Sequence, residues 1–315
     1  MFTNRMIRNL LVPVVLEQIL NSIMGTADTM MVSNVGSAAL SAVSLVDSIN
    51  VLLIQAFSAL AAGGAIVCAQ YIGQRNYEKA NMSARQVLFI ITAISVVVSA
   101  VCLIFQKPLL RLIFGAVDAD VMRASEIYFF FTALSFPFIA AYDSAASIFR
   151  AQENTKGPMT ISMISNIMNI GGNAVLIWVF HLGVAGAAIS TLVSRIFCAV
   201  VVLWQLRKDR QPVVVKDYLK IRPDWSMIGR ILGLGIPSGI ENSMFQLGKL
   251  AIQSTVSTLG TAAIAAQAMT NILENLNGIA AIGVGVGLMT IVGQCLGAGR
   301  KDEAVYYIKK LCVIA

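Results

Sequence analysis

Histidine, clustered cysteine and charge are scarce in this sequence. Its 315 residues include one histidine and five cysteines, and only 12% of the residues are charged. The cysteines are scattered through apolar segments, without the spacing of a metal site or of a disulfide framework. Soluble domains carry about 25% charged residues. These scarcities argue against a soluble domain, and they leave an enzyme no side chains for catalysis. We expect no enzyme activity and no resident cofactor or metal.

Apolar sequence is abundant instead, at 57% of the residues. A membrane-spanning helix needs about 20 consecutive apolar residues, and lipid requires every backbone polar group to be paired within the element. The sequence therefore predicts an all-α integral membrane protein, built as a polytopic helical bundle. The expected spans are residues 10–32, 38–71, 87–106, 127–149, 159–181, 184–206, 229–258 and 262–296, with a ninth that begins near Ala304.

The basic residues responsible for the net charge of +7 lie mostly in short loops between these spans. This distribution argues against a nucleic-acid partner. With the N-terminus in the cytoplasm, the outer loops hold only Lys107, Arg111 and Arg123. Because cytoplasmic loops are enriched in Lys and Arg, a cytoplasmic N-terminus is predicted. No cleavable signal peptide is expected, since the first span is too long for one. The predicted location is a cell membrane, the bacterial cytoplasmic membrane, with the lipid bilayer as a partner.

The sequence also contains an internal repeat. A shift of 224 residues places landmarks of the first half on identical residues of the second: Pro13 on Pro237, Glu17 on Glu241, Gly63 on Gly287, Gln70 on Gln294 and Gly73 on Gly297. An even number of spans separates the copies, so they share one orientation. Such duplication is typical of secondary transporters.

We predict three parts from this repeat. They are a six-helix N-lobe at residues 1–206, a cytoplasmic linker at 207–228 and an incomplete C-lobe at 229–315, with two helices and the start of a third. A chain that ends within its second lobe looks like a fragment and is not expected to transport by itself.

Four polar residues are predicted to lie at one depth in the N-lobe. Asp28 and Asn173 each stand 15 residues after a proline that marks a helix entry, and Thr191 lies about two turns into span six. Asn169 is four residues before Asn173 and shares its face. Such oxygens could coordinate a hard cation, or Asp28 could hold a proton. Alternatively, the amides and the hydroxyl only bond neighbouring helices, at about 0.6 kcal/mol each.

Several segments resemble the multidrug and toxic compound extrusion (MATE) family. In the first half these are EQILNSIMGTADTMMVSNVG (17–36), RAQENTKGPM (150–159) and LGVAGAAISTLVSR (182–195). In the second half GIPSGIENSMFQLGKL (235–250) and IVGQCLGAGRKDEA (291–304) resemble the opening of the second lobe. The resemblance implies a twelve-helix antiporter that exports cationic or amphipathic compounds in exchange for sodium ions or protons. It implies organic cations as substrates, and we expect a monomer.

The resemblance also implies a cation site. By position, the first-helix aspartate of the family matches Asp28, and its other ligands match Asn169, Thr191 and the carbonyl of Ala187. The family has a second aspartate where Asn173 stands. The loss of that charge weakens the case for tight sodium binding and leaves proton coupling open.

Other polar residues within the spans have two interpretations each. Asp47 and Asn50 could line the substrate cavity or bond helices together. Glu17 and Glu241 could contact substrate, although a gating or structural role at the lobe interface is favoured. Lys249 and Glu274 lie in adjacent spans, so an ion pair is expected. Asp143 and Arg150 are expected to reach the membrane interface from an inner helix end.

A flippase for lipid-linked oligosaccharides is the alternative function within the same superfamily. Such a transporter needs a cationic cavity for pyrophosphate. Apart from Arg230, which ends the basic cytoplasmic run at the entry of span 229–258, the basic residues within the expected spans are Arg195 and Lys249. The flippase is therefore the less favoured hypothesis.

Overall fold

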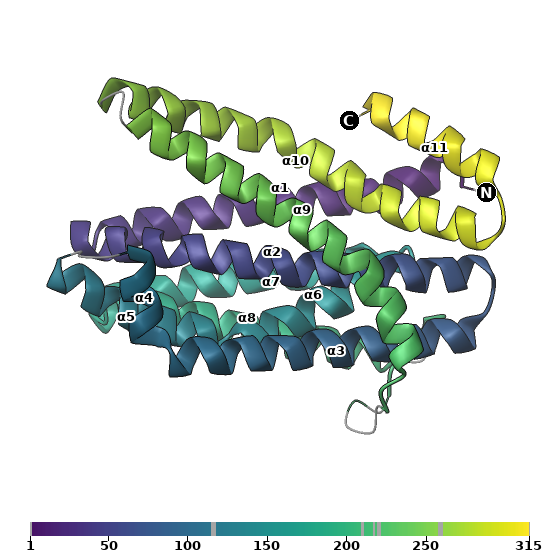
Figure 1. Ribbon diagram of the computed structural model, residues 1–315, viewed down its shortest axis with the longest axis horizontal. Coiled ribbons are helices and arrows are strands. Elements are labelled where there is room, and N and C mark those ends of the chain that lie inside the picture. The colour runs from purple at the N-terminus through teal and green to yellow at the C-terminus, as the bar shows by residue number, and fades with distance from the viewer. Residues whose placement is uncertain are drawn as a thin grey trace.

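The computed structural model describes residues 2–114, 118–208, 211–216, 218, 222–257 and 261–314. Apart from turns and short connections, the described residues form helices (Figure 1). In the first half these are α1 (Asn4–Ser33), α2 (Ser37–Gly73), α3 (Tyr77–Ile104), α4 (Gln106–Phe114), α5 (Ala119–Leu134), α6 (Phe136–Ala151), α7 (Lys156–Asn173), the π-helix η1 (Ala174–Val179) and α8 (Val184–Leu206). They are followed by α9 (Trp225–Ser257), α10 (Thr261–Gly297) and α11 (Lys301–Ile314).

The polytopic helical fold predicted from the sequence is confirmed. In the described part of the chain, six helical segments are long and apolar enough to cross a membrane, or seven if α5 and α6 count as one bent span. The predicted span at 229–258 corresponds to α9, which has 33 residues but is not among these six. We call the end of the bundle where α1 begins the proximal face and the end where α1 finishes the distal face.

The span predicted at residues 127–149 is bent in the structure. The structure breaks it at Ser135 into α5 and α6, which are bent by 42°. Pro137 follows the break and has no N–H for a backbone hydrogen bond, which explains why the helix cannot continue unbent. At the bend, the Ser135 hydroxyl donates to the Thr132 carbonyl (2.6 Å) and accepts from Arg195 Nη1 of α8 (2.7 Å). The bend therefore creates a polar contact inside the bundle.

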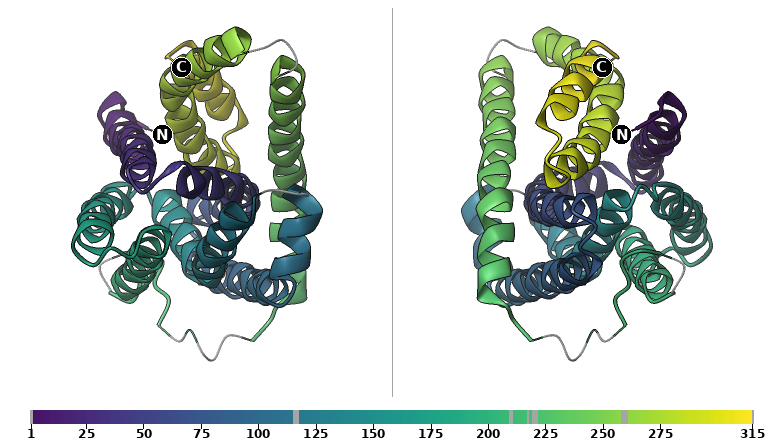
Figure 2. Two further views of the ribbon diagram at one scale, coloured as in Figure 1. Left: turned by 90° about the vertical axis from the view of Figure 1, so that its left-hand side faces the viewer. Right: turned by 90° about the vertical axis from the view of Figure 1, so that its right-hand side faces the viewer.

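Two apolar clusters hold the helices together. The larger cluster joins α2, α3, α5, α6 and α8 around fully buried side chains such as Phe57, Phe129 and Phe136. The smaller cluster joins the start of α1 to α10 and α11. Beside it, the Phe2 amide donates to the Tyr307 hydroxyl (2.8 Å). Viewed end-on, α10 and α11 lie above α2 and to one side of α1, away from α8 (Figure 2).

The two repeats meet through contacts that follow the 224-residue shift. Gly63 of α2 lies against Gly235 of α9. In the equivalent place, Gly287 of α10 lies against Leu11 of α1. Ala69 and Gly293, which occupy equivalent positions in the two repeats, contact each other directly. Figure 1 shows α10 beside α2 at the proximal face and diverging from it toward the distal face. The repeats are thus related by a pseudo-twofold axis, and glycines permit their close approach at the proximal face.

Candidate functional site

Asp28 lies in a polar cluster formed by α1, α7 and α8. The Asn173 amide donates to Asp28 Oδ1 (2.6 Å) and, at 3.3 Å, to Asn169 Oδ1. The Asn169 amide donates to Thr191 Oγ1 (3.3 Å), and the Thr191 hydroxyl donates to the Ala187 carbonyl (3.0 Å). The structure therefore brings together all five residues that the sequence suggested for a cation site.

The amide groups of Asn169 and Asn173 can make contacts beyond those just described. If the Asn169 amide turns over, its nitrogen donates to Asp28 at 2.8 Å (Oδ1) and 3.3 Å (Oδ2). Asn173 Oδ1 is buried and has no hydrogen-bond partner in the described part of the chain. A buried acceptor without a donor is costly unless a cation or a water approaches it. The cluster thus combines one carboxylate with amide, hydroxyl and carbonyl oxygens, which are the ligands of hard cations.

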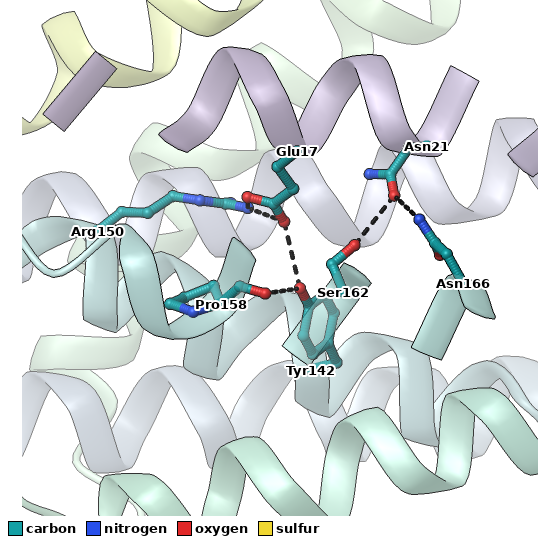
Figure 3. Close-up of polar contacts among 7 residues, drawn as sticks. All are labelled: Glu17, Asn21, Tyr142, Arg150, Pro158, Ser162 and Asn166. Carbon is teal, nitrogen blue, oxygen red and sulfur yellow. Dashed lines mark hydrogen bonds and ion pairs between the residues drawn. The ribbon is translucent and has the colours of Figure 1, made fainter. Parts of the chain in front are cut away.

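The cluster is one end of a polar seam between α1 and α7. These helices run in parallel, and residues 145 apart in sequence pair along them, as Asn21 does with Asn166 and Asp28 with Asn173. Asn21 Oδ1 accepts from Asn166 Nδ2 (3.1 Å) and from the Ser162 hydroxyl (3.0 Å) (Figure 3). Sequence reasoning missed Asn21, Ser162 and Asn166. The signal was present, because each helix has polar residues at helical spacing after its proline.

Glu17 lies at the proximal end of the seam and corrects the expectation for Arg150. Arg150 does not reach the interface: its Nη2 lies 2.9 Å from Glu17 Oε1, and the side chains are 19% and 3% exposed. The Tyr142 hydroxyl also bonds Glu17 and lies 3.2 Å from the Pro158 carbonyl (Figure 3). A carboxylate so deeply buried needs such partners. Glu17 therefore joins α1 to α6 near the proximal face.

The structure also places the other residues that the sequence singled out, which are Asp47, Asn50, Lys249, Glu274 and Glu241. Asp47 Oδ1 accepts from Asn50 on its own helix (3.1 Å) and from the Tyr128 hydroxyl of α5 (3.2 Å), so here it bonds two helices. The ion pair between Lys249 and Glu274 is confirmed at 2.7 Å, between α9 and α10.

Glu241 of α9 is exposed, unlike Glu17 at the equivalent position of the first repeat. Equivalent residues of the two repeats therefore do not have equivalent surroundings. A shared residue type at matched positions says nothing about which helices surround it.

Comparison with known proteins identifies the family. The MatE family model matches residues 13–175 and 237–315. The chain belongs to the MatE family. It is 27% identical over 308 residues to the probable multidrug resistance protein YoeA of Bacillus subtilis, covering 95% of this chain and 66% of YoeA. It is also 27% identical to the uncharacterized transporter YisQ of the same species, covering 93% of this chain and 65% of YisQ.

Solved structures match the MatE fold. An outward-facing multidrug resistance MATE transporter of the MOP superfamily superposes with a TM-score of 0.91 at 20% identity, covering 98% of this chain and 68% of that one. The chain thus spans about two thirds of the length of the relatives it matches. Family membership, together with its apolar helices, makes it a multi-pass membrane protein.

Proposed function

We propose that this chain provides the N-lobe and the opening of the second lobe of an antiporter. The transporter would export cationic or amphipathic small molecules, such as drugs and toxic metabolites, in exchange for sodium ions or protons. The observation that carries the proposal is Asp28, a carboxylate on α1 whose hydrogen-bond partners among the described residues are neutral amides. A carboxylate inside a membrane span without a cationic contact marks an ion pathway.

The arrangement of the two repeats suggests how the ion would act. The repeats contact each other at the proximal face, where glycines of α2 and α10 lie against the other repeat. Loading of Asp28 by a cation would replace its bond to Asn173 and loosen α1 from α7. Because the start of α1 packs on α10 and α11, movement of α1 would alter the contact between the repeats. This sequence of events is alternating access.

Cationic substrates fit the charges of the spans better than anionic ones do. Of the two basic residues expected within the spans apart from Arg230, Lys249 is paired with Glu274. Arg195 donates to Ser135 and lies near Asp47 and Asp28. Neither is available to bind a pyrophosphate, so nothing here favours the flippase alternative. The distribution of Lys and Arg supports a cytoplasmic N-terminus in a bacterial membrane, and two repeats in one chain support a monomer.

Dye efflux tests the proposal. Cells that express the complete gene product are loaded with a fluorescent cationic dye, and efflux is followed under a proton gradient and then under a sodium gradient. Asp28→Asn should abolish coupled efflux, while Asp120→Asn, which removes an exposed carboxylate of α5, should not. Normal efflux by Asp28→Asn, with equal amounts of protein in the membrane, would remove Asp28 from the mechanism.

A further inference from the structure

An apolar groove lies between the first half of α1 and α10, with α11 at its proximal end; we call it the α1–α10 groove. It measures about 570 Å³, a size common among ligand sites. Its floor is buried and includes Ile7, Leu11 and Val284. Its rim includes Val12 and Leu16, which are 48% and 45% exposed. The groove therefore opens to the outside of the bundle.

The polar residues of the groove gather at its proximal end. They are Asn4 and Arg8 of α1 and Lys310 of α11. Leu16, at the other end of the α1 wall, is eight residues beyond Arg8, which is about 12 Å of helix. Among the described residues, none of those that line the groove is acidic. The groove is thus apolar along most of its length and positively charged at one end.

The positive charge at this end has no counter-charge in the described part of the chain. Arg8 is exposed and makes no ion pair there. Lys310 Nζ donates to Asn4 Oδ1 (2.6 Å) and lies 5.7 Å from the centre of the Tyr306 ring. Both of these partners are neutral. The charges of Arg8 and Lys310 are therefore available to an anion.

The length of the groove matches one leaflet of a bilayer. Its α1 wall runs from Asn4 to Leu16, which is about 18 Å of helix. The hydrocarbon core of a bilayer is about 30 Å thick, so one leaflet takes up about 15 Å. A lipid whose acyl chain follows the groove would place its headgroup at Arg8 and Lys310. Basic pockets between membrane-spanning helices are known to bind anionic lipid headgroups.

Other occupants fit the groove less well. A cationic compound of the kind proposed for export would be repelled by Arg8 and Lys310. A neutral lipid would fill the apolar part but leave both charges without a partner. An anionic phospholipid satisfies the apolar wall and the charged end together.

We propose that the α1–α10 groove binds one anionic phospholipid, with an acyl chain between α1 and α10 and the phosphate between Arg8 and Lys310. Arg8 belongs to the first repeat and Lys310 to the second, so the bound lipid joins the repeats at the proximal face. The site goes beyond the proposed export function. It does not depend on Asp28 or on the identity of the coupling ion.

Native mass spectrometry tests the proposal. The complete gene product, purified in detergent, is mixed with equal amounts of phosphatidylglycerol and phosphatidylcholine that carry the same acyl chains, and the bound lipids are counted as their concentration rises. One phosphatidylglycerol should bind before any phosphatidylcholine. Arg8→Gln combined with Lys310→Gln should weaken this binding about 30-fold, because each basic group near a membrane surface contributes about 1 kcal/mol.

Arg5→Gln combined with Lys309→Gln is the matched control. It removes two charges from the same two helices, at exposed positions that do not line the groove. This variant should bind phosphatidylglycerol as the wild type does. Equal losses in the two double variants would overturn the proposal, because the basic groups would then act only through general attraction to an anionic surface.

Ala280→Phe tests the apolar part of the site. Ala280 lines the groove and is exposed, so a phenylalanine there would fill the groove while leaving both charges in place. This variant should no longer retain phosphatidylglycerol, whereas Ala281→Phe, at an exposed neighbour outside the lining, should retain it. Unchanged binding in Ala280→Phe would overturn the proposal. So would a wild type that does not prefer phosphatidylglycerol, as expected if another segment of the protein covers the groove.

Discussion

Gly73 of α2 and Gly297 of α10 occupy reciprocal places in the contact between the repeats. Gly73 lies against the carbonyl of Gln294, and Gly297 lies against the carbonyl of Gln70. The 224-residue shift exchanges the two contacts, so a pseudo-twofold axis passes between them. A Cβ atom on either glycine would overlap the facing carbonyl oxygen. Glycine is thus required on both sides, for the close approach of two backbones rather than for a turn.

Alanine at either glycine should therefore weaken the contact. Overpacking a close contact costs about 1–3 kcal/mol, and the obstacle here is backbone, which cannot rotate away. We expect Gly73→Ala and Gly297→Ala each to lower the thermal unfolding temperature of the purified chain. The double variant should cost less than the sum, because both changes act on one contact. Unfolding followed by tryptophan fluorescence measures the effect.

Gly285 provides the control for this comparison. It lies on α10, like Gly297, but a Cβ there would meet nothing within 4 Å. Gly285→Ala should be neutral or stabilising by about 0.5–1 kcal/mol, the usual gain from replacing a helical glycine. If Gly297→Ala behaves like Gly285→Ala, the two helices are not in close contact in the membrane protein.

The Glu17–Arg150 pair should be far more important for stability than the Lys249–Glu274 pair. Glu17→Gln would leave the buried Arg150 guanidinium without its carboxylate. Removal of one partner of a buried pair costs about 3–5 kcal/mol. Replacement of both partners, as in Glu17→Gln combined with Arg150→Met, should recover part of this loss. Denaturant-induced unfolding of the four proteins forms a double-mutant cycle that measures the coupling.

Lys249 and Glu274 form the comparison pair. Their nitrogen and oxygen lie 2.7 Å apart, but the side chains are 40% and 50% exposed. Glu274→Gln should cost about 0–1 kcal/mol, as exposed pairs do. Equal costs for Glu17→Gln and Glu274→Gln would show that the Glu17 pair is not buried in the folded protein.

The features that the sequence predicts correctly are those that follow from counting residues along a helix. Counting residues from Pro13 and Pro158 placed Asp28 level with Asn173, because a helix rises by a fixed amount per residue, and the two are bonded in the structure. The pairing of Lys249 with Glu274 followed from adjacent antiparallel spans. The spans themselves followed from apolar runs of sufficient length.

The parts that it missed depend on contacts between helices distant in the chain. The sequence predicts Arg150 at the interface because its own helix ends there, yet its partner Glu17 is 133 residues away. The bend at Ser135 could have been suspected from Pro137. Its contact with Arg195 could not, because Ser135 and Arg195 are 60 residues apart and meet only after the bundle has packed. Local patterns do not record which faces of two helices meet.

Asn173 contacts the Asp28 carboxylate with an uncharged side chain. Asn173→Asp would place a second carboxylate beside Asp28, in place of an amide that now donates to it at 2.6 Å. A unit charge about 4 Å away contributes about 4 kcal/mol at an effective dielectric constant of 20. Even a third of that energy strengthens binding about tenfold. We therefore expect Asn173→Asp to bind sodium at least tenfold more tightly than the wild type at alkaline pH, measured by ²²Na⁺ titration in nanodiscs.

Asn166→Asp is the matched control. It adds the same charge to the same helix, but at a residue that bonds Asn21 rather than Asp28. Seven residues of helix separate the two positions, which is about 10 Å, so the added attraction at Asp28 should be well under half as large. Tighter sodium binding by Asn173→Asp alone would show that the charge is felt at Asp28. Equal effects of the two variants, or weaker binding by Asn173→Asp, would show that Asn173 does not face the ion and that its amide only holds α1 to α7.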